Sequence, residues 1–209
     1  SSSSSTPSSY IARAVLIDTE AKVVQEALSS RKQGGWDYNR GSCHTPHDCG
    51  ASNNWAEGYL RLGPSVWDSA SDSIRKEMER ADRVEGILLL GSVAGGTGSG
   101  VGALVAEKLK DDELQRGAPV MNTVVWPYSS GEVVVQNYNA CLTLSKLIQA
   151  SDAVMVVEND HIHDACSRLL GLKTVRIQDL NMVIASQIAH SLLPCHEGVS
   201  LPKGGGVAE

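Results

Sequence analysis

The chain has 209 residues, a formal net charge of −6 and a composition ordinary for a globular protein. This length supports one domain with a real hydrophobic core. The negative charge argues against a protein built to coat nucleic acid or an anionic membrane, so neither is an expected partner. Five scattered cysteines argue against a disulfide framework and favour a reducing compartment.

Apolar runs typical of buried strands alternate along the chain with segments of helical periodicity. The Ser-rich stretch 1–9 has the composition of disordered chain, 29–63 is expected to be loop with a short helix, and 194–209 is expected to be a flexible tail. Strands are predicted at 14–17, 86–90, 120–126 and 153–157, and helices at 69–83, 101–110, 132–149, 160–170 and 179–193. The alternation predicts an α/β fold over 10–193, with a Rossmann-like parallel sheet flanked by helices.

A glycine-rich run from Ala94 to Gly100 follows one predicted strand and precedes a predicted helix. Glycines let the backbone approach an anion closely, and the N-terminus of the next helix supplies positive potential. Thr97 and Ser99 add hydroxyl donors. This position predicts a phosphate-binding loop at the carboxyl edge of the sheet, with no internal helix or strand. A tight turn without a ligand is the alternative.

Two known phosphate-binding motifs can be compared with this run. Val101 stands where a P-loop requires lysine, so that motif is excluded. The pattern Gly98-x-Gly100-x-x-Ala103 loosely fits a dinucleotide fingerprint, although no acidic residue closes the next strand. An NAD-binding oxidoreductase domain is therefore the rival interpretation.

Carboxylate and amide side chains follow several predicted strands. Asp18 and Glu20 follow the first strand and could hold Mg²⁺ beside phosphates, or form a solvated loop. Asn53, Asn159 and Asn181 carry amides that can read a purine edge, although asparagine more often caps a helix or forms a turn.

A second cluster has the ligand types of a zinc site. Cys43, His44, His47 and Cys49 lie within one short stretch. Structural zinc sites generally take their ligands from two separate elements, so the crowding argues against zinc here.

The glycine run also resembles the phosphate loop of the tubulin family, with Ala94 in place of that loop's first glycine. Other segments resemble landmarks of the same family in the same order: 14–20, 50–59, 136–144, Asn159 and 179–181. The resemblance covers about 10–193. Finer features, including Gln136-Asn137-Tyr138-Asn139 where alpha- and beta-tubulins carry Glu-Pro-Tyr-Asn, resemble the delta-tubulin branch.

The resemblance implies a cytoskeletal protein that binds GTP or GDP with Mg²⁺ and works with other tubulins or microtubules. It also implies a location at centrioles or basal bodies in the cytoplasm, with the cilium and the nucleus as further compartments. It implies these site residues: for phosphate, Ser92, Ala94, Gly95, Gly96, Thr97, Gly98, Ser99, Gly100 and Asn53; on the magnesium side, Asp18 and Glu20; for ribose and guanine, Gln136, Asn159, Ile177 and Asn181.

Two of these positions depart from the family pattern. Gln136 replaces a carboxylate near the ribose, and Ile177 replaces the aromatic residue that stacks on the base. Loss of that stack is expected to weaken binding by about 1–3 kcal/mol.

The family's first phosphate loop, its later domains and the acidic residue that acts in trans during hydrolysis have no counterpart in this sequence. We therefore expect a nucleotide-binding fragment that hydrolyses little or no GTP alone, and we assign no catalytic residue. A tubulin remnant that keeps the sheet without binding nucleotide is the remaining alternative.

Overall fold

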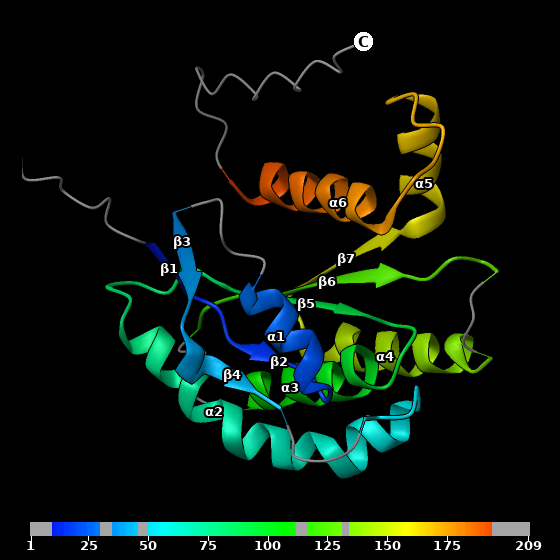
Figure 1. Cartoon of the computed structure of the whole chain (residues 1–209). Coiled ribbons are helices and arrows are strands. Elements are labelled where there is room, and N and C mark those ends of the chain that lie inside the picture. The colour runs from blue at the N-terminus through cyan, green and yellow to red at the C-terminus, as the bar shows by residue number, and fades with distance from the viewer. Residues whose placement is uncertain (1–9, 30–34, 46–49, 112–116, 131–133, 194–209) are drawn as a thin grey trace, which may run out of the picture. The chain divides into compact units, whose positions relative to one another are not determined.

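The computed structural model describes residues 10–29, 35–45, 50–111, 117–130 and 134–193 (Figure 1). The chain divides into two compact units, Ser1–Glu158 and Asn159–Glu209, and each is described by itself.

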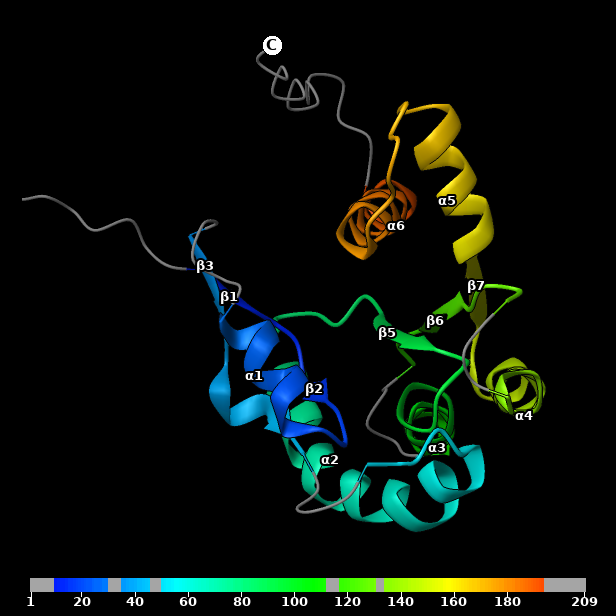
Figure 2. The same cartoon turned by 45° about the vertical axis from the view of Figure 1, so that its right-hand side comes forward.

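The main sheet of the first unit is parallel, as the sequence predicts. It contains β5 (Ile87–Ser92), β6 (Val120–Trp126) and β7 (Ala153–Glu158) in the order β5-β6-β7. The connecting helices α3 (Gly102–Asp111) and α4 (Gln136–Ala150) lie side by side against one face of the sheet (Figure 2). Apolar side chains from the strands and both helices form a buried core between them: Val93, Ala106, Val124, Ala140, Leu147 and Ala150.

The described residues of this unit also form two short parallel pairs of strands. β1 (Tyr10–Ala12) pairs with β3 (Trp36–Tyr38), and β2 (Leu16–Ile17) pairs with β4 (Cys43–His44). The sequence predicts β2 two residues too long at its start and misses the other three strands. Strands of two or three residues are too short to carry an alternation of apolar and polar side chains, and only their pairing reveals them.

The helices of the first unit also begin differently from the prediction. α1 (Ala21–Ser29) follows β2, and the 3₁₀ turn η1 (Arg40–Ser42) precedes β4. α2 (Gly63–Glu79) begins before the predicted residue 69, directly after the π-helical segment η2 (Glu57–Leu62). A proline in its first turn suits this start because the missing N–H would have no partner there.

The glycine run is a loop only in its first half. Thr97–Val101 forms a second π-helical segment, η3, that leads into α3. The prediction of a loop through Gly100 was wrong for this half. Glycine in a helix costs roughly 0.5–1 kcal/mol relative to alanine, and here a close backbone packing offsets that cost.

In its described residues, 159–193, the second unit contains two helices packed against each other, α5 (Asn159–Arg168) and α6 (Ile177–Leu192). Their bounds lie within two residues of the predicted ones. The carboxylate of Asp179 accepts a hydrogen bond from the backbone N–H of Arg176 at 2.8 Å, which caps the start of α6. Among the described helices, none combines the length and the apolar character needed to cross a membrane.

Candidate nucleotide-binding site

The glycine loop is held in shape by hydrogen bonds within its own segment. The Ser92 hydroxyl accepts a bond from the backbone N–H of Ala94 at 3.2 Å, and the buried Ser99 hydroxyl donates to the carbonyl of Gly95. The first N–H groups of a helix have no partner within it, so the amides at the start of η3 are available to an anion. Ser99 acts on the loop backbone in this structure, and its predicted phosphate contact remains a prediction.

Packing explains why several loop positions are glycine. A Cβ atom on Gly96 would lie 2.5 Å from Cβ of Ala51, and one on Gly100 would overlap the carbonyl of Trp55. A Cβ on Gly98 would lie 2.7 Å from the backbone nitrogen of Ser92. These glycines are needed for contacts within the chain, which the sequence did not reveal.

Gly95 differs from its neighbours because its Cα has room for a side chain. The nearest atom to a Cβ there is Oδ1 of Asn53, at an ordinary contact distance of 3.5 Å. A side chain added at Gly95 would therefore point toward Asn53 and contact it without a clash.

The acidic turn after β2 contacts the glycine loop through two threonines. The hydroxyl oxygens of Thr19 and Thr97 are 2.5 Å apart, and Thr19 is buried, with an exposed fraction of 5%. Oδ1 of Asp18 accepts a hydrogen bond from the backbone N–H of Glu20 at 2.9 Å, which shapes the turn. The turn with both predicted magnesium-side carboxylates thus lies beside the predicted phosphate loop. Thr19 was missed because a single threonine carries no motif.

The turn at Ser52 and Asn53 has a left-handed backbone. Their φ angles are 48° and 53°, values that residues other than glycine adopt rarely and that recur in functional turns. The next residue, Asn54, accepts a hydrogen bond from the N–H of Ala56 at 2.9 Å and so caps the short helical turn that leads into η2. The two neighbouring asparagines therefore differ in role: Asn54 caps a helix, and Asn53 faces the glycine loop at Gly95.

The first turn of α4 supplies two buried amides. Gln136 donates to the carbonyl of Tyr128 at 3.2 Å, and its predicted contact with the ribose remains a prediction. The side-chain amide of Asn139 makes three hydrogen bonds, with backbone groups of Trp55, Asn53 and Ala94. Asn139 was not predicted as a site residue. Its spacing of four and eight residues from Thr143 and Leu147 was the available signal, because it places a polar amide on a buried helix face.

The residues predicted to read guanine lie in the second unit. Asn159 is the first residue of α5 and is half-buried, and Ile177 is the first residue of α6 and is exposed. Asn181 is exposed one turn after Ile177, so the two share a face of α6. Their roles in guanine and base contact remain predictions.

A cluster of charged and aromatic side chains links η2 to α3 and α4. Tyr59 stacks on Trp55 with ring centroids 4.4 Å apart, and its hydroxyl donates to the carboxylate of Glu107. Nζ of Lys146 lies 3.1 Å from Oε1 of Glu107 and 5.0 Å from the centroid of the Tyr59 ring. The hydrogen bond from Tyr59, supported by Lys146, holds the pKa of Glu107 below its usual value.

The alternative zinc cluster is not supported in the described part of the chain. Cys43 and His44 are consecutive in β4, so their side chains leave opposite faces of the strand. Sγ of Cys43 contacts the carbonyl of Asn39 at 3.7 Å, and Nε2 of His44 lies 2.9 Å from the hydroxyl of Ser73. Burial raises the pKa of Cys43 and lowers that of His44. His47 and Cys49 lie outside the described residues.

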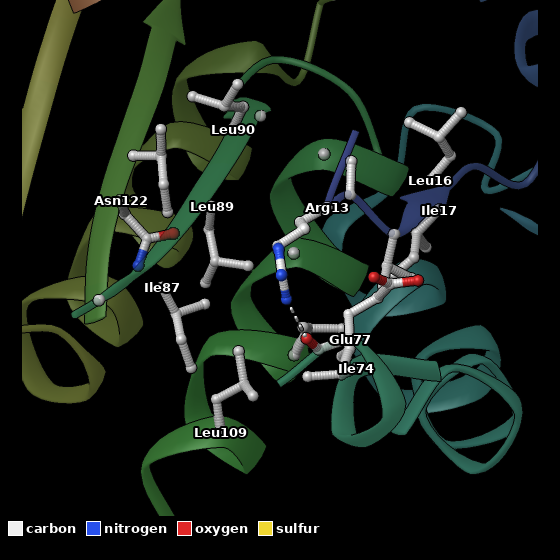
Figure 3. A pocket seen from close by; sticks show the side chains of 18 of the residues that line it. Arg13, Leu16, Ile17, Ile74, Glu77, Ile87, Leu89, Leu90, Leu109 and Asn122 are labelled. Carbon is white, nitrogen blue, oxygen red and sulfur yellow. Dashed lines mark hydrogen bonds between the residues drawn. The ribbon is translucent and has the colours of Figure 1, made fainter. Parts of the chain in front are cut away.

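A groove of about 880 Å³ separates β2 from β5 (Figure 3). Its walls are mainly apolar, with Leu16 and Ile17 on one side and Ile87 and Leu89 on the other, while Thr97 lines it near the glycine loop. An aliphatic lining does not suit phosphates, so we place the candidate phosphate contacts at the loop end of the groove rather than along it.

Comparison with known proteins identifies the family. Residues 3–167 match the Tubulin/FtsZ family, GTPase domain. The chain is 44% identical over 191 residues to the tubulin delta chain of Macaca fascicularis, and the matched residues cover 91% of this chain and 42% of the relative. The human tubulin delta chain has the same identity and coverage. That of Canis lupus familiaris is 44% identical over 187 residues, covering 89% of this chain and 41% of the relative.

The chain thus spans about two fifths of the length of these curated relatives. The family match confirms the resemblance drawn from the glycine run and the other landmarks, and it overturns the rival interpretation as an NAD-binding oxidoreductase. The parallel α/β sheet agrees with it. The chain belongs to the tubulin family.

Proposed function

We propose that this chain binds GTP and GDP, with Mg²⁺, through the glycine loop and the two turns beside it. The observation that supports this most is the hydrogen bond between the hydroxyls of Thr19 and Thr97. It joins the acidic turn to the predicted phosphate loop, two segments that are distant in the sequence. Carboxylates next to an anion-binding loop are the arrangement that a phosphate–magnesium pair requires.

The residues of the loop fit a phosphate group. Gly95 lies beside Asn53 without close packing, and the amides at the start of η3 lack partners within the helix. Asn53 would contact a phosphate from the opposite side, with Ser92, Ala94, Gly96, Thr97, Gly98, Ser99 and Gly100 forming the rest of the loop. Asp18 and Glu20 would hold Mg²⁺ directly or through water, and the ion would neutralise phosphate charge.

The contacts to the nucleoside belong to the same proposal. Gln136 would lie near the ribose, and Asn159 and Asn181 would read the guanine edge through their amides. Ile177 would offer an aliphatic contact to the base where an aromatic residue would stack.

The cellular role is proposed from the relatives. Tubulin delta chains are the proteins to which this chain is similar, and we propose that it works with other tubulins or microtubules. The finer proposal is a role at centrioles or basal bodies and in cilium assembly. We expect this chain to hydrolyse little GTP alone, because the family resemblance implies that an acidic residue supplied in trans is needed for hydrolysis.

The test is a titration with a fluorescent GTP analogue, with and without Mg²⁺, competed by GTP, ATP and NAD. Saturable binding displaced by GTP alone is expected. The variant Gly95→Asp is expected to weaken it at least about tenfold, because a carboxylate would face the phosphate at short range. Gly41→Asp is the matched control, since a Cβ there meets only Oδ1 of Asn39 at 3.4 Å.

Three outcomes would contradict the proposal. Absence of binding by folded protein would make the chain a tubulin remnant without nucleotide. Displacement by NAD or ATP as readily as by GTP would contradict the guanine specificity. Equal affinity of the Gly95→Asp and Gly41→Asp variants would place the nucleotide away from the glycine loop.

A further inference from the structure

Asn139 is a buried amide at the meeting point of three segments. It lies in the first turn of α4 with an exposed fraction of 3%. Its Oδ1 accepts a hydrogen bond from the backbone N–H of Trp55 at 3.1 Å. Its Nδ2 donates to the carbonyl of Asn53 at 2.8 Å and to the carbonyl of Ala94 at 2.7 Å.

The chemistry of these partners selects asparagine. The site presents two carbonyl acceptors and one N–H donor, and a side-chain amide offers two N–H donors and one oxygen at a single end. An ionised aspartate would instead place an oxygen, which cannot donate a hydrogen bond, next to both carbonyl oxygens. A leucine of similar shape would leave all three backbone groups buried without partners, and each such loss is costly.

The two carbonyls belong to the segments that form the candidate phosphate site. Asn53 lies in the left-handed turn, and Ala94 begins the glycine loop. A strained turn keeps its conformation only where its surroundings hold it. The Asn139 amide supplies such a hold, since both of its N–H groups are used to tie the turn to the loop.

We propose that Asn139 is a positioning residue of the nucleotide site: it sets the spacing between Asn53 and the glycine loop without itself touching the ligand. This inference rests on the proposed function for its effect on nucleotide. The geometric part, in which one amide couples the two segments, stands on the hydrogen bonds alone.

The test uses the variant Asn139→Asp. Asn137→Asp is the matched control, because it makes the same chemical change at an exposed position in the same helix turn. At pH 7.5 the Asn139→Asp variant is expected to bind the fluorescent GTP analogue at least tenfold more weakly than wild type. Burial and the two carbonyls would raise the pKa of the new carboxyl, so lowering the pH would protonate it and restore one donor.

The ratio of wild-type affinity to Asn139→Asp affinity is therefore expected to fall at least threefold between pH 7.5 and pH 5.5. The corresponding ratio for Asn137→Asp is expected to stay constant. Protonation would also restore stability to the fold, so affinities are compared only at pH values where circular dichroism shows the variant fully folded. Folded Asn139→Asp protein that binds within twofold of wild type at pH 7.5, or a loss that does not change with pH, would overturn the inference.

Hydrogen exchange separates this inference from the proposed function. Without nucleotide, the backbone amides of Trp55 and Gly95 and the side-chain amide of Asn139 are followed in wild-type protein by nitrogen-15 NMR. Slow exchange of the Asn139 side-chain amide is expected even if no nucleotide binds. Rapid exchange of that amide would overturn the inference, including in the case where the Asn139→Asp variant does not fold.

Discussion

At the scale of single residues, the glycine run combines positions with different reasons for being glycine. A Cβ on Gly96 would clash with Ala51, whereas one on Gly95 would make only an ordinary contact with Asn53. We expect Gly96→Ala to lower the free energy of unfolding by about 1–3 kcal/mol, since its Cβ would force backbone to move. Gly95→Ala is expected to leave it unchanged or raise it by up to about 1 kcal/mol through the unfolded state. Urea unfolding followed by tryptophan fluorescence measures both, and equal losses would contradict this distinction.

Glu20 gives a prediction about the metal at the same scale. In Glu20→Gln the turn keeps its shape, because the bond to Asp18 uses the backbone N–H of residue 20. We expect the gain in GTP affinity on adding Mg²⁺ to fall by about tenfold, which corresponds to about 1.4 kcal/mol. Glu26→Gln on α1 is the control with the same chemical change. An undiminished magnesium effect in Glu20→Gln would remove that carboxylate from the proposed metal side.

At the scale of elements, the cluster of Tyr59, Glu107 and Lys146 connects η2, α3 and α4. The pKa of Glu107 is lowered in the folded state, mainly by the hydrogen bond from Tyr59. A carboxyl with a depressed pKa stabilises the fold above its unfolded pKa of about 4.3, and this contribution disappears as the pH falls through the folded value.

Glu107→Gln is therefore expected to lower the free energy of unfolding at pH 7 and to have a diminishing effect below about pH 4. The side chains of Lys146 and Glu107 are 34% and 35% exposed, so solvent screening keeps the expected loss at about 0.5–1 kcal/mol. Urea unfolding across this pH range measures it, with Glu85→Gln in the highly exposed pair with Arg83 as the control. A loss that grows as the pH falls would contradict the assigned sign.

The free edge of β5 gives a second prediction for an element. The N–H of Ile87 donates to Pro119 and that of Val93 to Val125, so alternate residues of β5 face β6. Leu88 and Leu90 then turn their N–H groups toward the groove, where β5 has no neighbouring strand in the described sheet. We expect their amides to exchange with solvent faster than that of Leu89. Equal protection of Leu88, Leu89 and Leu90 in hydrogen-exchange NMR would indicate that this edge is covered.

At the scale of the whole molecule, the net charge of the protein and the charge of the proposed ligand are both negative. The net charge is −6, and the proposed phosphate contacts come from backbone amides and neutral side chains. Sites built from lysine and arginine lose affinity for anions as salt increases. Here we expect the affinity for GTP, at fixed Mg²⁺, to stay constant or increase when the ionic strength rises from about 10 mM to about 150 mM. A tenfold decrease in the fluorescence titration would indicate a cationic contact that the proposal lacks.

The groove between β2 and β5 is also a feature of the whole first unit. Arg13, before β2, donates to the carbonyl of Glu77 near the end of α2, and Thr19, after β2, contacts Thr97. β5 likewise runs from the segment after α2 toward the glycine loop. The two strands therefore run in the same direction along opposite walls of an apolar groove. Nothing in the sequence indicated this arrangement, because β2 pairs with β4 over only two residues.

The sequence by itself determined the fold class, the main strands and helices, and the family. These follow from local patterns: apolar runs such as 153–157, and a glycine run too unusual to be ambiguous once other landmarks follow in order. Even there the helical second half of the run was missed, because close packing against Ala51 and Trp55 decides it.

The tertiary structure alone decided which distant residues meet. Thr19 carries no local signal, and the spacing of Asn139 from Thr143 and Leu147 indicates only that it lies on a buried helix face. Which backbone groups these buried side chains bind depends on the partners that folding brings to them. The same holds for the two- and three-residue strands, whose pairing depends on segments far along the chain. Hydrogen bonds and close contacts act through distances in space, and these become defined only when the whole unit packs.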